Sequence, residues 1–461
     1  MKQIEGPKIL PAIQLYHWIM NPLGFLEECV QKYGDTFNLN LLGFPPFTIV
    51  SHPQANQEIF SVDSRQFDAG RGNGLIRVLV GDNSLFLMDG DRHRRERKLL
   101  MPPFHGDKVK SYAQTICDIA AVAASQWQTR QPFKAQKAMQ DITLEIILHV
   151  VFGLSEGERY QKMKPLIAHL LDMVGAPLRA SVLFLPILQQ DWGAWSPWGQ
   201  FVRCRQTIYD LLQAEIDQRR SQPDSNGNDV LSLMLSARDE DGQPMTDAEL
   251  KDEMITLLTA GHETTATSLS WAFYWIEKLP EVKEKLLQEL DSLPENADPL
   301  EVSRLPYLTA VCSETLRIYP VGIIAFPRIA KSPVEIMGYH FDQEAMLAPC
   351  IYLTHQREDL YPEPKKFRPE RFLERQYTPN EFLPFGGGNR RCIGYVLALL
   401  EMKLVLATIL TDYELTLASD RPVVPRRRGG TIAPHNGVPI ILKGKRSRPQ
   451  PSITEPVFSQ T

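Results

Sequence analysis

A helix-forming segment that begins at Thr246 places the strongest constraint on how this chain can fold. Residues Thr246 to Glu249 (Thr-Asp-Ala-Glu) match a helix-capping box, and helix-compatible residues continue to Leu279, where Pro280 ends the pattern. The segment has about 33 residues, or about 50 Å at a rise of about 1.5 Å per residue, which is long enough to cross a domain. We therefore expect one helix that traverses the folded protein.

The middle of this segment contains residues that weaken a helix. Ala260-Gly-His-Glu-Thr-Thr265 places a glycine, which costs about 1 kcal/mol relative to alanine, beside two adjacent threonines. Conflicts between local propensity and the overall pattern are typical of functional sites. A kinked core helix with a polar face explains the same residues. Periodicity alone leaves both interpretations open.

The rest of the chain predicts a mainly α fold with a small β region. Short strands with proline and glycine turns are expected at 36–50 and 334–352. Neither set of strands can form a sheet alone, so the sheet should draw on both ends of the chain. Most of 54–320 is expected to be helical, with the clearest runs at Lys108–Trp127, Asp141–Val151 and Val202–Arg219.

The composition and the positions of loop-forming residues indicate one globular domain. Loop-like residues at 221–229 are too few for a domain linker, so we expect a single domain over 1–442 and a disordered tail over 443–461. The net charge of -5 argues against a nucleic-acid-binding protein. The prolines and charges of the first 35 residues do not fit a signal peptide or a transmembrane anchor, which predicts a cytoplasmic protein.

One of the six cysteines has unusual neighbours. None is in a CxxC pair or has zinc-like spacing, so neither a disulfide framework nor a structural zinc site is expected. Cys392 lies in Phe385-Gly-Gly-Gly-Asn-Arg-Arg-Cys-Ile-Gly394, directly before a predicted helix at Tyr395–Thr411. Backbone N–H groups and the positive end of a helix dipole stabilise a thiolate there. The glycines let the backbone approach a flat ligand and turn N–H groups toward the sulfur, whereas phosphate-binding spacings are absent.

This segment resembles the FxxGxRxCxG signature of the cytochrome P450 superfamily at all five fixed positions. Further motifs follow in the order typical of that family, and the resemblance covers about residues 5 to 442. It implies a triangular, mainly helical prism with haem between the long central helix and the cysteine loop. The additional matching segments are the helix run Ala260–Thr264, Glu314-Thr-Leu-Arg317 and Pro369-Glu-Arg-Phe372.

The resemblance also implies a cofactor and its contacts. The cofactor is haem b (iron protoporphyrin IX), with the Cys392 thiolate as axial iron ligand and electron donor to the iron. Guanidinium groups suit the two haem propionates, although the family more often has tryptophan at the position of His93. The expected cofactor-binding residues are Cys392, His93, Arg97, Arg328, Arg390, Phe385 and Gly394.

The same resemblance implies roles for two further groups of residues. Glu263 and Thr264 match the acid–threonine pair that supplies protons during oxygen activation, and Gly261 is expected to leave space for dioxygen. Glu314 and Arg317 lie three residues apart on one helix face and, with Arg371, match a buried cluster that fixes the cysteine loop.

The expected reaction is hydroxylation or epoxidation of a hydrophobic molecule by one oxygen atom of O2, while the other atom leaves as water. The expected haem domain accounts for the whole folded chain and leaves no residues for a fused electron-transfer module. The two electrons are therefore expected to come from a separate acidic ferredoxin or flavodoxin with an NAD(P)H reductase. A basic cluster is expected to steer that donor, and we expect a monomer. The cluster comprises Arg94, Arg95, Lys98 and Arg391.

Substrate class is predicted from apolar stretches at family pocket positions, which are 71–89, 166–188, the helix near Ala260, 321–326 and 432–438. They favour a long-chain fatty acid first and a terpenoid second, although core packing gives the same composition. A haem-thiolate peroxygenase or isomerase would usually lack the acid–threonine pair, and a haem-binding sensor would usually carry an output module. The candidate pocket residues are Leu75, Ile76, Leu79, Phe86, Ala260, Val321 and Ile324.

Overall fold

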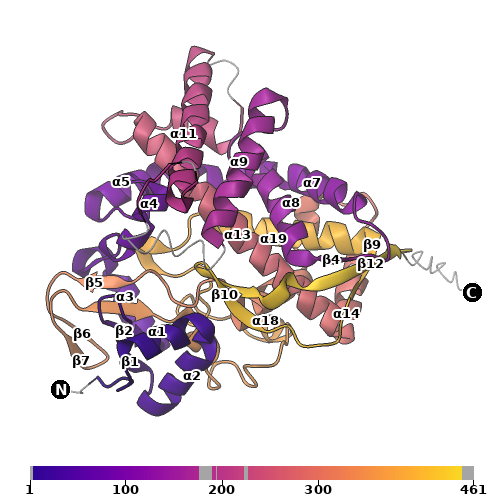
Figure 1. The fold of residues 1–461 in the computed structure, drawn as a ribbon. Coiled ribbons are helices and arrows are strands. Elements are labelled where there is room, and N and C mark those ends of the chain that lie inside the picture. The colour runs from indigo at the N-terminus through magenta and orange to yellow at the C-terminus, as the bar shows by residue number, and fades with distance from the viewer. Residues whose placement is uncertain (1–3, 176–188, 194, 223–226, 449–461) are drawn as a thin grey trace, which may run out of the picture.

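The computed structural model describes residues 4–175, 189–193, 195–222 and 227–448. Helices dominate the fold, and the long α13 runs through its middle (Figure 1). The helices are α1 Pro11–Met20, α2 Pro22–Tyr33, α3 Pro53–Gln66, α4 Arg77–Val80, α5 Gly90–Leu100, α6 Gly106–Ser111, α7 Ala113–Ser125, α8 Ala135–Val150, α9 Gly157–Gly175, α11 Pro197–Ser221, α12 Val230–Ser236, α13 Asp247–Lys278, α14 Pro280–Asp291, α15 Pro299–Val302, α16 Pro306–Ile318, α17 Ile351–His355, α18 Arg371–Glu374 and α19 Tyr395–Asp412.

Short strands form small sheets at the edges of the helical body. The largest sheet has the order β1-β2-β8-β5-β3, in which β2 and β8 are parallel and the other pairs are antiparallel. It therefore joins strands from both ends of the chain, as expected. The strands are β1 Thr36–Leu39, β2 Phe47–Val50, β3 Phe67–Asp68, β4 Pro132–Lys134, β5 Arg328–Ala330, β6 Val334–Ile336, β7 Tyr339–Phe341, β8 Met346–Pro349, β9 Tyr413–Leu417, β10 Pro425–Arg428, β11 Thr431–Pro434 and β12 Pro439–Lys445.

The central helix has the boundaries that the sequence predicts. Thr246 accepts from the backbone N–H of Glu249, and the Glu249 carboxylate accepts from the backbone N–H of Thr246, which completes the capping box. The helix ends at Lys278, before Pro280. It packs most extensively on α8 and also contacts α16 and α19, and these helices form the main core.

Two boundaries differ from the sequence expectation. The helix expected at Lys108–Trp127 is divided into α6 and α7 at Tyr112. At the other end, β12 continues to Lys445 and Arg446 pairs with Asp291, so ordered chain extends past residue 442. Antiparallel pairing with β9 supplies the backbone hydrogen bonds that hold Gly444 and Lys445 in the strand.

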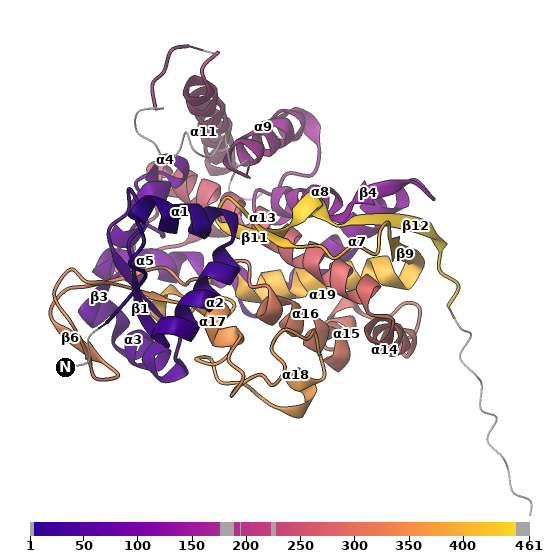
Figure 2. The ribbon, with the colours of Figure 1, turned by 60° about the horizontal axis from the view of Figure 1, so that its bottom comes forward.

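The N-terminal helices lie at the outer surface, beside the sheet formed by β1 and β2 (Figures 1 and 2). Among the described residues, no helix combines the length and apolarity needed to cross a membrane.

Candidate functional site

The loop that carries Cys392 is folded back on itself by its own backbone. The N–H of Cys392 donates to the carbonyl of Phe385 at 3.0 Å. Gly386 and Gly388 have φ values of 68° and 64°, which side-chain-bearing residues rarely adopt. A Cβ atom on Gly387 would lie 2.4 Å from the Phe60 ring, so only glycine fits against α3. The glycines are therefore needed for the loop geometry itself.

Opposing effects act on the Cys392 thiol. Burial raises its pKa, whereas a hydrogen bond from the Gly394 N–H and the positive charges of Arg97 and Arg391 lower it. The side chain nevertheless keeps accessible surface. A side chain that is surrounded by protein atoms and still keeps accessible surface faces an internal space, as Cys392 does here. The helix-terminal N–H donor expected from the sequence is present.

Three of the groups expected to bind propionates, Arg97, Arg328 and Arg390, lie within electrostatic reach of the fourth, His93. Burial lowers the pKa of His93 to about 3, and the charges of Arg390, Arg97 and Arg328 add to that effect, so the imidazole is neutral. Burial also lowers the pKa of Arg97, while the nearby Cys392 raises it. Within the described part of the chain, no carboxylate forms an ion pair with Arg97. An anionic ligand beside Cys392 would supply the missing charge.

Arg390 is held by a residue that sequence reasoning did not identify. Its guanidinium pairs with Asp89 at 2.6 Å and donates to the carbonyls of Leu85 and Met88. The Asp89 carboxylate also accepts from the backbone N–H groups of residues 69, 70 and 71 at 2.8–3.0 Å. Asp89 therefore joins the segment before α5 to the cysteine loop, about 300 residues later in the chain, a link that no linear motif reveals.

The Glu314–Arg317–Arg371 cluster forms as the resemblance implies. Arg317 donates to both carboxylate oxygens of Glu314 at 2.7 and 2.8 Å, and Arg371 donates to Oε1 at 3.1 Å. The side chains of Glu314 and Arg317 are 0% exposed and that of Arg371 is 2% exposed. The backbone N–H of Arg368 adds a further bond to Oε1. The carboxylate is thus the common acceptor for two buried cations.

His355 connects this cluster to the cysteine loop. Arg317 donates to the His355 carbonyl at 2.9 Å, and Nε2 of His355 accepts from the N–H of Leu383 at 3.0 Å, two residues before Phe385. Burial and the charge of Arg317 lower the pKa of His355 to about 3, so the imidazole remains a neutral acceptor. The sequence carried no signal for this role, because the imidazole and its partner are joined only by folding.

Glu263 and Thr264 are neighbours on α13 with different partners. The Thr264 hydroxyl donates to the Ala260 carbonyl at 2.5 Å, one turn earlier. The Glu263 carboxylate accepts from Gln136 at 3.2 Å and Gln140 at 2.6 Å, both on α8. Arg428 Nε of β10 lies 3.0 Å from Glu263 Oε1 as an ion pair, without hydrogen-bond alignment. Burial raises the pKa of Glu263, and Arg428 and Gln140 oppose that rise.

Gly261 lies where α13 packs against α8. A Cβ atom at this position would lie 3.2 Å from Ile147 Cδ1 of α8. The glycine therefore favours the close packing of α13 on α8, and its expected role in leaving space for dioxygen stays a prediction. Close helix contact also explains why Gln136 and Gln140 reach Glu263.

The candidate pocket residues have different environments. Phe86 lies in a T-shaped contact with Phe326, with ring centroids 5.0 Å apart, which joins the segment before α5 to the one after α16. Leu79 is buried in the main core, whereas Leu75 is exposed. Partly buried positions, which suit a pocket wall better, are Ile76, Phe86, Ala260, Val321 and Ile324. Much of the stretch expected at 166–188 lies outside the described residues.

Comparison with known proteins decides the family. The cytochrome P450 family model matches residues 4–438. The chain belongs to the cytochrome P450 family. As a cytochrome P450 it is a monooxygenase that depends on haem, dioxygen and electrons from a redox partner.

Three similar proteins cover nearly the whole P450 chain. The cytochrome P450 135B1 of Mycobacterium bovis is 37% identical over 442 residues, which are 96% of this chain and 91% of that protein. The cytochrome P450 135A1 of Mycobacterium tuberculosis is 32% identical, with 96% and 95% coverage. The retinoic acid-bound cyanobacterial CYP120A1 has a TM-score of 0.82 at 26% identity and covers 96% of this chain and 100% of its own. The mycobacterial names give no substrate.

The residues of this P450 fit a haem group. A thiol stands at a helix N-terminus, and Arg97, half-buried beside it, has no carboxylate partner among the described residues. His93 adds a neutral donor, and Arg328 and Arg390 add cations, of which Arg390 is positioned by its ion pair with Asp89. Such a donor set suits a ligand with one soft metal centre and two carboxylates.

Proposed function

We propose that this P450 hydroxylates or epoxidises an elongated, lipid-like carboxylic acid. The grouping of Cys392 with Arg97, His93, Arg328 and Arg390, which fits haem b, supports the haem-dependent oxidation. The partly buried apolar side chains Ile76, Phe86, Val321 and Ile324 support the lipid-like substrate. Long-chain fatty acids are the first candidate substrates. Isoprenoid acids are the second, because the similar CYP120A1 is bound to retinoic acid, which has an apolar chain and a terminal carboxylate.

In this proposal, Cys392 would hold the haem iron, and the neutral His93 together with Arg97, Arg328 and Arg390 would hold the propionates, with Arg390 positioned by its ion pair with Asp89. When bound, haem b supplies the redox-active iron at which dioxygen is reduced and one oxygen atom passes to the substrate. Thr264 donates or accepts a proton through its hydroxyl. The Glu263 carboxyl group takes up and releases a proton, while the amides of Gln136 and Gln140 on α8 hold it in place by hydrogen bonds. The rings of Phe86 and Phe326 bind the apolar chain.

Binding spectra test the substrate class. The holoenzyme is titrated with fatty acids of increasing length, with retinoic acid, and with the matching methyl esters, and the shift of the Soret band is recorded. We expect a saturable shift with long free acids of at least one class. Shifts only with short or strongly polar compounds would contradict the lipid-like substrate without affecting the assignment of the haem ligands.

We expect Thr264→Ala to uncouple the enzyme. Without the hydroxyl, proton delivery is disordered, so product per electron donor consumed should fall by about 10²-fold while hydrogen peroxide accumulates. Substrate-binding spectra should change little. Thr265→Ala, a buried neighbour on the same helix, serves as the matched control and should retain coupling. Equal coupling in the two variants would remove Thr264 from the relay.

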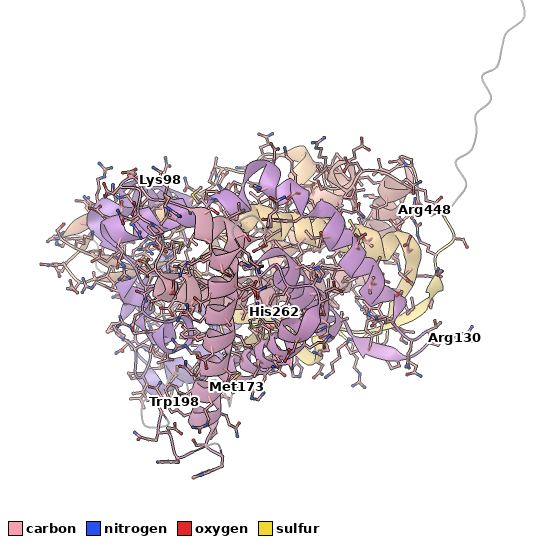
Figure 3. The ribbon with its side chains drawn as sticks, turned by 90° about the horizontal axis from the view of Figure 1, so that it is seen from above. Lys98, Arg130, Met173, Trp198, His262 and Arg448 are labelled. Carbon is pink, nitrogen blue, oxygen red and sulfur yellow. The ribbon has the colours of Figure 1, made fainter. Side chains whose placement is uncertain are left out.

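The basic cluster expected to steer the electron donor is partly neutralised. Arg95 is half-buried and pairs with Asp239 at 2.6 Å and with Glu96 at 3.2 Å, so it is not available for docking as expected. Arg94 and Lys98 are 68% and 70% exposed and pair with the exposed Asp91 and Glu240. Figure 3 shows Lys98 toward the edge of the molecule. Because such surface pairs are weak, both cations can exchange them for carboxylates of a partner.

We propose that an acidic ferredoxin or flavodoxin docks at Arg94 and Lys98. The double reversal Arg94→Glu with Lys98→Glu should slow first-electron transfer by about tenfold at low ionic strength, and the difference should shrink as salt rises. Stopped-flow reduction measures the rate. Lys137→Glu with Lys162→Glu, on α8 and α9, changes the net charge equally and should leave the rate unchanged. An equal slowing in both pairs would contradict a local docking site.

A further inference from the structure

Helix α1 exposes an apolar face although its buried side includes a polar residue. It buries Trp18 and also Gln14, which is 2% exposed and donates to the carbonyls of Pro7 and Ile9 at 3.1 Å. Gln14 also accepts from the backbone N–H of Asn40 at 3.0 Å. Surface helices normally bury the apolar side and expose the polar one. On α1 the outward arc consists of Ala12, Ile13, Tyr16, Ile19 and Met20.

The turn between β1 and β2 extends this outward face. Leu42 and Phe44 are exposed at its tip, and the N–H of Leu42 donates to the Pro11 carbonyl at 3.2 Å, which fixes the turn beside the start of α1. A contiguous set of this kind differs from scattered surface leucines and marks an interaction site. We call it the N-terminal apolar face; its members are 37–69% exposed and comprise Ile9, Leu10, Ile13, Tyr16, Ile19, Met20, Leu42 and Phe44.

Exposed cations lie at both ends of α1 in the N-terminal apolar face. Between Glu5 and Glu27 the chain has no acidic residue, although its net charge is -5. Lys8 is exposed just before α1. At the other end, the exposed Arg426 of β10 donates to the Met20 carbonyl at 2.6 Å. The apolar surface is therefore framed by positive charge at both ends of the helix.

We propose that the N-terminal apolar face docks on an anionic lipid bilayer. An apolar helix face with basic residues at its border, lying flat in the headgroup region, is the arrangement that binds such surfaces. Tyr16 suits the same depth, because its ring is apolar and its hydroxyl is polar. A second copy fits less well. A two-fold dimer through this face would bring Lys8 and Arg426 toward their own copies with no acidic residue of α1 between them.

Vesicle co-sedimentation of the full-length holoenzyme tests the proposal. We expect binding to vesicles of phosphatidylglycerol with phosphatidylcholine, much weaker binding to pure phosphatidylcholine, and a decline with rising salt. Leu10→Glu with Tyr16→Glu should reduce the bound fraction by at least about tenfold, because it places two carboxylates in the apolar arc. Val122→Glu, at a residue of α7 that is 60% exposed, is the matched control and should bind as the wild type does.

The experiments distinguish binding of the N-terminal apolar face to a membrane from binding to a second copy of the protein. Wild-type protein that stays in the supernatant with anionic vesicles overturns the proposal. So does a dimer in analytical ultracentrifugation that Leu10→Glu with Tyr16→Glu dissociates while vesicle binding is unchanged. Each variant is first checked to have the haem spectrum of the wild type. A second, milder variant is Lys8→Gln with Arg426→Gln, which should lower only the salt-sensitive part of the vesicle binding.

Discussion

Replacing Cys392 by serine should abolish the thiolate-type difference spectrum of the CO complex and remove monooxygenase turnover. A serine oxygen donates far less charge to iron than a thiolate does, so the electronic basis of both properties is lost. The Gly394 N–H and the charges of Arg97 and Arg391 act on the sulfur position in this structure, and they cannot turn a hydroxyl into an equivalent donor. The loss should exceed that of any other single cysteine variant.

A matched cysteine variant keeps this test specific. Cys117→Ser changes a partly buried thiol on α7, away from the glycine-rich loop, and should retain the thiolate-type spectrum. Haem content is measured for both variants, so that loss of ligation is separated from loss of cofactor. A thiolate-type spectrum in Cys392→Ser would show that another cysteine is the ligand.

Replacing Glu314 by glutamine has the second largest expected effect, and it acts on the fold. The carboxylate is the shared acceptor of Arg317 and Arg371, all three nearly without exposed surface. Removing its charge leaves two buried cations uncompensated, which should lower the free energy of unfolding by about 3–5 kcal/mol. Because Arg317 also holds His355, whose ring accepts from Leu383, the cysteine loop should loosen and haem content should fall.

Urea unfolding followed by tryptophan fluorescence, with haem content in parallel, measures this loss. Glu284→Gln on α14 removes an exposed carboxylate and should change stability by less than about 0.5 kcal/mol. Arg371→Lys should have an intermediate effect, because Arg371 makes only one of the bonds to the carboxylate. A Glu314→Gln variant as stable as Glu284→Gln would contradict the structural role of the cluster.

Site features whose partners are close in sequence were predictable. Glu314 and Arg317 are three residues apart on one helix, and the capping box of α13 spans Thr246 to Glu249, so helix geometry alone brings each pair together. The cysteine loop is equally local, because Cys392 bonds back to Phe385. The family motifs add the more distant Arg371 and Arg97.

Features that depend on how helices dock were not predictable. Gln136 and Gln140 reach Glu263 only because α8 lies against α13, and Gly261 serves that contact. Asp89 meets Arg390 across about 300 residues of chain. A single glutamine or aspartate in a helix or loop has no periodicity or spacing that identifies its partner.

The sequence by itself therefore determined the family, the central helix, the thiolate candidate and the buried ion cluster, because local backbone geometry and short motifs encode them. The tertiary structure decided which charged side chains are available to bind a partner and which helix faces are covered by other parts of the protein. Arg95 was expected to be a docking residue and is instead paired with Asp239 and Glu96, and α1 exposes apolar side chains such as Ile13 and Tyr16 to solvent. The reason is physical: pairing and burial are properties of the neighbours that folding supplies, and those neighbours come from distant parts of the chain.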